Sequence, residues 1–150
     1  MGKKLSGIAF GQRTKQKGQS DTAQLIKLRN FIKQRFDMDF KRNWYVGFDK
    51  EYGYVTRIVD KVTKKQRKQF EWREPDLLRV DRKYGLIIIE LDGSVHDHKT
   101  ERTEKRNKLF RGAGIKLIVI NIANAKEIGK TIEKVCECEM MKLIGSGCDG

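Results

Sequence analysis

The sequence predicts an α/β protein in which helices flank a central mixed β-sheet. Three observations support this class. Apolar residues recur at helical spacing after Ser20, two β-branched runs occupy residues 86–91 and 115–122, and a densely charged segment between these runs ends at glycines. The expected order is helix, three strands, helix, strand, helix. With 150 residues, the chain is long enough for one domain and too short for two.

The elements follow from local patterns. Ser20-Asp21 is a good N-cap for a first helix that ends near Phe36. Residues 39–48 and 54–59 contain strand-forming residues separated by a polar turn. The uniformly apolar run 115–122 predicts a strand covered on both faces, and Asn124 is the expected cap of a single final helix. We therefore expect a basic arm at residues 1–19, one domain at 20–145 and a tail at 146–150.

Residues 76–91 predict a β-hairpin, because two apolar runs flank the polar turn 81–85. If Val80 pairs with Leu86, then Leu78 lies opposite Ile88 and Asp76 lies opposite Glu90. Asp92 follows on the same face, since side chains alternate along a strand.

Opposed residues of an antiparallel pair have β-carbons about 4.5–5.5 Å apart, so the Asp76 and Glu90 carboxylates would repel each other. A hard divalent cation such as Mg²⁺ or Mn²⁺ would compensate, and its natural substrate in a basic protein is a phosphodiester. The alternatives are a strand-entry turn role for Asp76, an ion-paired structural role for Glu90, and a turn-forming role for Asp92 before Gly93.

His96 is the best candidate for moving a proton, because its ordinary pKa lies near neutrality and Gly93 allows the chain to bend back toward the acids. His96 as a plain surface residue is the alternative. Its neighbour Lys99 is a candidate for contacting phosphate.

The net charge of +13 indicates a polyanionic partner, and the expected partner is DNA. Two stretches, residues 1–19 and 61–70, each contain five Lys or Arg residues and no acid. The second could also be a solvated strand-edge loop. The candidate nucleic-acid-binding residues share a positive charge and are Lys15, Lys17, Lys61, Lys64, Lys65, Arg67, Lys68, Lys99 and Arg106.

The chain has no apolar run of the roughly 20 residues that a membrane helix needs, and its start lacks the apolar core of a signal peptide. We therefore expect a cytoplasmic protein without a membrane partner. The three cysteines form no repeated metal-binding pair, which favours reduced thiols.

The stretch 75–98, PDLLRVDRKYGLIIIELDGSVHDH, followed by Arg106-Asn107 and residues 112–115, resembles the PD-(D/E)XK nuclease superfamily. Within it, the very-short-patch-repair-like (Vsr-like) branch combines a Pro-Asp strand, an apolar strand ending in an acid, a glycine bend and a histidine. That branch includes phage-type homing endonucleases with an acid, Asp and His active site. The resemblance covers about residues 20–122 and implies a restriction-endonuclease-like sandwich from a prokaryotic or phage source.

The resemblance implies metal binding by Asp76 and Glu90, with help from the Leu91 carbonyl, and a general-base or water-positioning role for His96. Asp92 stands where the superfamily usually has a catalytic Lys. Gln24 occupies the place of a metal-reaching Glu on the first helix and would still orient a water. Ser94 replaces a zinc-binding Cys of the mismatch-repair members, which favours a homing or restriction type of enzyme.

The expected activity is therefore a metal-dependent DNA endonuclease that leaves a 5′-phosphate, as the resemblance implies. A structure-selective nuclease acting on junctions or mismatches, and a non-catalytic DNA-binding protein on the same fold, remain the alternatives. An RNA substrate is also open. The last helix carries Met140, Met141 and Leu143, which are either core residues or one face of a homodimer.

Overall fold

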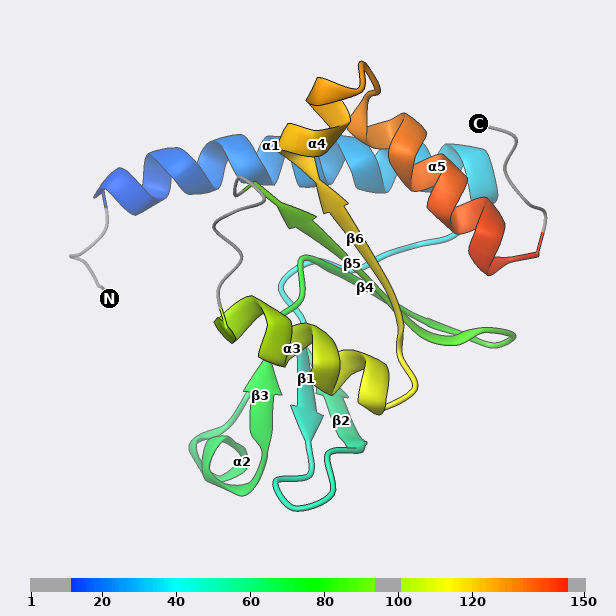
Figure 1. Ribbon diagram of the computed structural model, residues 1–150. Helices are drawn as coiled ribbons and strands as arrows, with labels where there is room; N and C mark the ends of the chain where they lie inside the picture. The colour runs from blue at the N-terminus through cyan, green and yellow to red at the C-terminus, as the bar shows by residue number, and fades with distance from the viewer. Residues whose placement is uncertain (1–11, 94–100, 146–150) are drawn as a thin grey trace.

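The computed structural model describes residues 12–93 and 101–145, with side chains from residue 22 onward (Figure 1). The described part is a mixed α/β structure, so the predicted class is confirmed. Its elements in chain order are α1 (Gln12–Phe36), β1 (Tyr45–Phe48), β2 (Val55–Val59), α2 (Lys64–Gln69), β3 (Glu71–Arg73), β4 (Leu77–Asp81), β5 (Gly85–Asp92), α3 (Glu101–Gly112), β6 (Lys116–Asn121), α4 (Ile122–Glu127) and α5 (Ile132–Leu143).

The described strands form two sheets of three strands, where the sequence predicted one central sheet. One sheet has the order β2-β1-β3 and is antiparallel. The other has the order β4-β5-β6, in which β4 and β5 are antiparallel and β5 and β6 are parallel. A single bridge between Lys41 and Leu78 links the segment before β1 to β4. The two sheets contact each other through side chains and not through a strand ladder. Val46 and Phe48 of β1 share one apolar cluster with Leu78 of β4 and Ile88 of β5.

The predicted hairpin register is confirmed within the ladder of β4 and β5. Val80 pairs with Leu86 and Leu78 pairs with Ile88. The turn between them is fixed by Asp81, whose Oδ2 accepts hydrogen bonds of 2.9 Å from the main-chain N–H groups of Lys83 and Tyr84. This local bonding explains why the register can be predicted from the sequence of the turn and the two apolar runs.

Two apolar clusters cover the two faces of the β4-β5-β6 sheet. On one face, α1 and α5 pack against the strands, and the cluster includes Leu28, Ile87 and Met140. On the other face, Phe110 of α3 stacks on Phe48 with ring centroids 5.8 Å apart. Figure 1 shows α1, α4 and α5 above β4, β5 and β6, and α3 below these strands, in front of the upper part of the β2-β1-β3 sheet. The expectation that 115–122 is covered on both faces is therefore confirmed.

Several predicted helix boundaries are wrong. The first helix begins at Gln12, before the expected cap at Ser20-Asp21, so residues 12–19 are helical. The basic run after residue 63 forms the short helix α2, which begins with a capping box, instead of a loop.

The single helix predicted after Asn124 is in fact two helices. Asn121 caps α4, since its Oδ1 accepts the Asn124 main-chain N–H at 2.9 Å, and Thr131 caps α5. Gly129 lies between them with φ 73°, a conformation that glycine adopts readily and that interrupts a helix. Met140 is fully buried, as expected for a core residue of the last helix.

The described cysteines differ in their state. Cys136 is a buried free thiol, whereas Cys138 takes part in a disulfide, so the prediction of reduced cysteines is wrong for Cys138.

No helix within residues 12–93 and 101–145 is both long and apolar enough to cross a membrane.

Candidate active site

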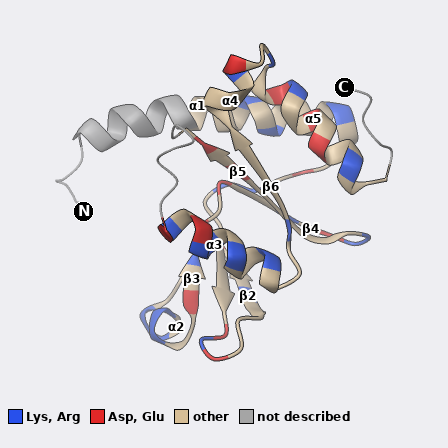
Figure 2. Ribbon diagram, viewed as in Figure 1, with Lys and Arg blue, Asp and Glu red and all other residues tan. Residues whose placement is uncertain are grey.

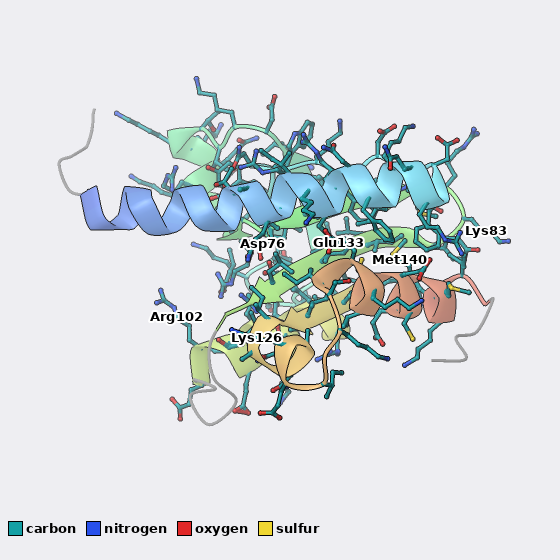
Figure 3. All side chains as sticks on the ribbon, turned by 90° about the horizontal axis from the view of Figure 1, so that it is seen from above. Asp76, Lys83, Arg102, Lys126, Glu133 and Met140 are labelled. Atoms are coloured by element: carbon teal, nitrogen blue, oxygen red, sulfur yellow. The ribbon has the colours of Figure 1, made fainter. Side chains whose placement is uncertain are left out.

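The candidate acids lie where the chain passes from the β2-β1-β3 sheet to the β4-β5-β6 sheet. β3 ends at Arg73, and Asp76 immediately precedes β4. The main-chain N–H of Asp76 donates to Glu90 Oε2 at 2.8 Å, and the main-chain N–H of Leu91 donates to Asp76 Oδ2 at 2.8 Å. The structure thus brings together the two acids that the hairpin register paired. In Figure 3, the view from above, Asp76 is labelled in the middle part of the molecule, among the strands.

The environment of Glu90 disfavours its charged form. Glu90 is only 4% exposed, and burial followed by the nearby Asp76 carboxylate raises its pKa to about 8. The Asp76 N–H and the Arg106 guanidinium act in the opposite direction and only partly offset these effects. A buried carboxyl whose pKa is raised in this way is the kind of group found at functional sites.

A third carboxyl, that of Glu74, belongs to the same electrostatic group and was missed by sequence reasoning. Glu74 is exposed overall, but partial burial of its carboxyl and then the charge of Asp76 raise its pKa. The signal was present in the sequence, since Glu74 stands two residues before Asp76 and therefore lies on the same side of an extended chain.

Arg106 was expected to contact nucleic acid, and in the structure it faces the acids. Its Nη1 lies 3.3 Å from Glu90 Oε1, while its Nε and Nη2 are 3.4 and 3.2 Å from Asn107 Oδ1. This ion pair joins α3 to β5 and gives Glu90 a positive partner. The alternative reading of Glu90 as an ion-paired carboxylate therefore has a definite structural basis.

Of the remaining candidate residues, Asp92 and Gln24 are described by the structure. Asp92 ends β5 beside Asn121 of β6, on the same face as Glu90. Gln24 is half-buried on α1, and within the described residues no hydrogen bond joins it to Asp76 or Glu90. His96 and Lys99 lie outside the described residues.

The oxygen donors for a cation at this site are the Asp76 and Glu90 carboxylates. In the described part of the chain, no three His, Cys, Asp or Glu side chains converge as a metal-binding group. Two carboxylates with waters nevertheless suit Mg²⁺, which is commonly bound through one or two protein carboxylates. Asp76 Oδ2 accepts the Leu91 main-chain N–H, and the Asp76 and Glu90 carboxyl groups are close enough to share a hydrogen bond, so a proton or a cation between them would relieve their repulsion. The two carboxyl groups are hard oxygen donors, so the residues present fit such a cation.

The predicted basic surface lies at the other end of β3. Its members are all exposed and lie on α2 or just before it: Lys61, Lys64, Lys65, Arg67 and Lys68. Figure 2 shows α2 as a largely blue segment below α3. Lys15 and Lys17 lie within α1, and their side chains are outside the described set.

Comparison with known proteins adds no relative. No protein-family model, no curated protein and no solved structure matches this chain.

Proposed function

We propose that the chain is a metal-dependent DNA endonuclease of the homing or restriction type, built on a restriction-endonuclease-like version of the α/β fold. The observation that carries the proposal is the pairing of Asp76 and Glu90. The Glu90 carboxyl accepts the main-chain N–H of Asp76, and the Asp76 carboxyl accepts the main-chain N–H of Leu91, the residue after Glu90. Glu90 is also buried, with a raised pKa. The net charge of +13 and the exposed lysines of α2 supply attraction for a phosphate backbone.

The protein groups have distinct roles in this proposal. Asp76 and Glu90 would hold Mg²⁺ or Mn²⁺, with the Leu91 carbonyl beside them. A bound ion neutralises charge developing on the phosphate and lowers the pKa of an attacking water. Arg106 holds Glu90 in place through the contact of 3.3 Å. Asp92 and Gln24 would orient water, and His96 would accept the proton.

The test is cleavage of supercoiled plasmid in Mg²⁺ and in EDTA by the wild type, Asp76→Asn and Glu90→Gln. The matched control is Asp60→Asn, which changes an exposed acid outside the site. We expect Mg²⁺-dependent nicking by the wild type and the control, and loss of at least about a hundredfold in rate for both site variants, with DNA retardation in a gel unchanged. Equal activity of Asp76→Asn and wild type would refute the assignment of the site.

A non-catalytic DNA-binding protein is the second candidate, and the Arg106–Glu90 ion pair favours it because a guanidinium already occupies one carboxylate oxygen. If intact plasmid, mismatched duplex and four-way junction all survive in Mg²⁺ and Mn²⁺ while binding persists, this second candidate is correct. Cleavage of only the mismatched or branched substrate would identify a structure-selective nuclease.

A further inference from the structure

A cavity of about 570 Å³ lies between the C-terminal half of α1 and the segment that leads to β1. Four cationic residues line it, namely Arg29, Lys33, Lys41 and Arg42, against one acid, Asp39. A cavity with this charge is suited to an anion. None of these residues was among the candidates identified from the sequence.

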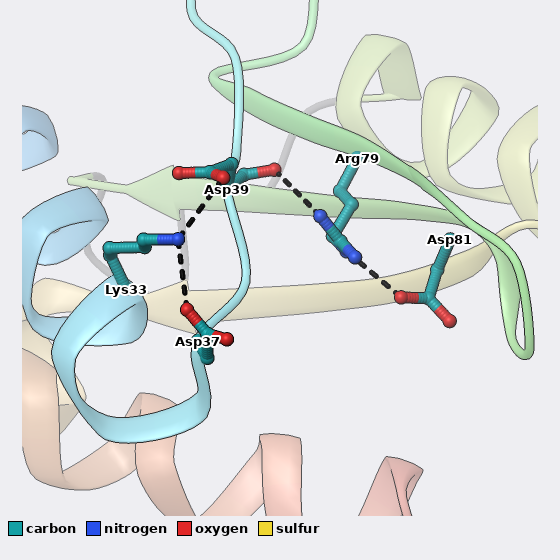
Figure 4. Close-up of polar contacts among 5 residues, drawn as sticks. All are labelled: Lys33, Asp37, Asp39, Arg79 and Asp81. Carbon is teal, nitrogen blue, oxygen red and sulfur yellow. Dashed lines mark hydrogen bonds and ion pairs between the residues drawn. The ribbon is translucent and has the colours of Figure 1, made fainter.

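The one acid of the cavity, Asp39, already has a cationic partner. Lys33 Nζ lies 2.9 Å from Asp37 Oδ1 and 3.2 Å from Asp39 Oδ2, and both contacts are drawn in Figure 4. The main-chain oxygen of Asp39 also accepts a hydrogen bond of 3.3 Å from Arg79, which pairs with Asp81. Lys33 is thus shared by two carboxylates, and the Arg79 contact ties this wall of the cavity to β4.

The other three cations have no acidic partner within the described residues. Arg29, Lys41 and Arg42 form no ion pair there. Lys41 Nζ instead lies 5.1 Å from the ring centroid of Trp44, a cation–π contact that positions the ammonium group at the cavity.

Arg42 provides the independent observation. Its Nε is buried and has no hydrogen-bond partner, the only such side-chain nitrogen or oxygen among the described residues. Buried donors are almost always paired in folded proteins, so Arg42, which lines the cavity, has an N–H whose acceptor would be a bound water or anion. A phosphate group supplies oxygens that match the guanidinium fork.

We propose that this cavity binds a backbone phosphate of a DNA strand, with Arg42 as the main donor, Arg29 and Lys41 as flanking cations, and Trp44 as a positioning residue for Lys41. The assignment to DNA rests on the proposed function, whereas the anion site rests on the cavity alone. The position supports DNA, because Lys41 and Leu78 exchange main-chain hydrogen bonds of 2.8 and 3.0 Å. Leu78 stands two residues after Asp76, so a strand seated in the cavity would run beside the candidate acids.

The test measures binding without cleavage, by fluorescence anisotropy of a labelled duplex in EDTA. Arg42→Gln should weaken binding about tenfold, because a charge-assisted contact is lost, and should lower the slope of log affinity against log salt by about one between about 50 and 200 mM KCl. Arg29→Gln and Lys41→Gln should each weaken binding by a smaller factor. The matched control is Arg82→Gln, which removes the same charge from an exposed position in the β4–β5 turn and should change affinity less than twofold.

The stability of the variant separates a binding role from a structural one. Since Arg42 Nε bonds to nothing in the described structure, Arg42→Gln should melt at the wild-type temperature or higher. A fall in Tm of more than about 5 °C would show that Arg42 supports the fold, and would overturn the proposal.

Inorganic phosphate distinguishes the two sources of the ligand. If calorimetry detects phosphate binding that Arg42→Gln abolishes, but DNA affinity is unchanged by that variant, the site serves a free phosphate compound and the DNA assignment is wrong. If neither ligand responds to Arg42→Gln, the anion site itself is refuted. If the plasmid assay fails while Arg42→Gln weakens DNA binding, the proposed catalytic function fails and the phosphate site stands.

Discussion

Replacing Glu90 by Gln should remove one contribution to the pH dependence of the free energy of unfolding. The pKa of Glu90 rises from 4.5 to about 8 on folding, mainly through burial and then through Asp76. Between these values the unfolded chain releases a proton that the folded protein keeps, so the free energy of unfolding falls as pH rises through this window. At about 1.4 kcal/mol for each pH unit, the full shift corresponds to roughly 5 kcal/mol. Relaxation and water entry reduce such penalties, and we expect about 2 kcal/mol.

The assay is urea unfolding in EDTA at pH values from about 5 to 9, with the wild type and Glu90→Gln compared at each pH. The variant has no titrating group at position 90, so its stability relative to wild type should increase with pH. Using the pH dependence of this difference removes any constant effect of altering the contacts to Asp76 N–H and Arg106. The control is Glu51→Gln in an exposed turn, for which the difference from wild type should stay flat.

A flat difference for Glu90→Gln would mean that Glu90 is ionised in the folded protein across the whole range. In that case Arg106 compensates the buried charge, and the acids have no electrostatic need for a further cation.

Three further outcomes are expected. Burial raises the pKa of the Cys136 thiol to about 12, so alkylation by iodoacetamide at pH 8 should reach Cys136 only after unfolding, and mass spectrometry of native protein should find it unmodified. Gly47→Ala should destabilise by about 1–3 kcal/mol, because the new β-carbon would lie 2.8 Å from ring atoms of Trp72; Gly112→Ala, which meets nothing within 4 Å, should be neutral or stabilising in the same thermal melt. Thr131→Ala removes the side-chain oxygen that caps α5 and should lower the free energy of unfolding by about 1 kcal/mol, whereas an unchanged denaturation midpoint would show that the cap is dispensable.

The prediction of the acidic pair succeeded because it depended on short-range geometry. The distance between Asp76 and Glu90 along the chain, the polar turn and the alternation of side chains are all readable from one segment. The hydrogen bond of 2.8 Å between Asp76 N and Glu90 Oε2 then follows from the register of the hairpin.

The contacts that modify the pair were not predictable in this way. Arg106 reaches Glu90 from α3, and its orientation depends on how that helix packs, with Phe110 stacked on Phe48 of the other sheet. From the sequence, Arg106 was one of many exposed-looking basic residues. Arg42 is a similar case, since the burial of its Nε arises only when the segment before β1 packs beside α1 and β4.

The sequence by itself determined the α/β class, the hairpin register and the pairing of two acids, because periodicity, turn chemistry and strand alternation act over a few residues. Only the tertiary structure decided that the strands divide into two sheets, that Arg106 pairs with Glu90 and that a cationic cavity forms beside Arg42. These features join segments far apart in the chain. Their burial and charge depend on which surfaces pack together, and no local pattern contains that information.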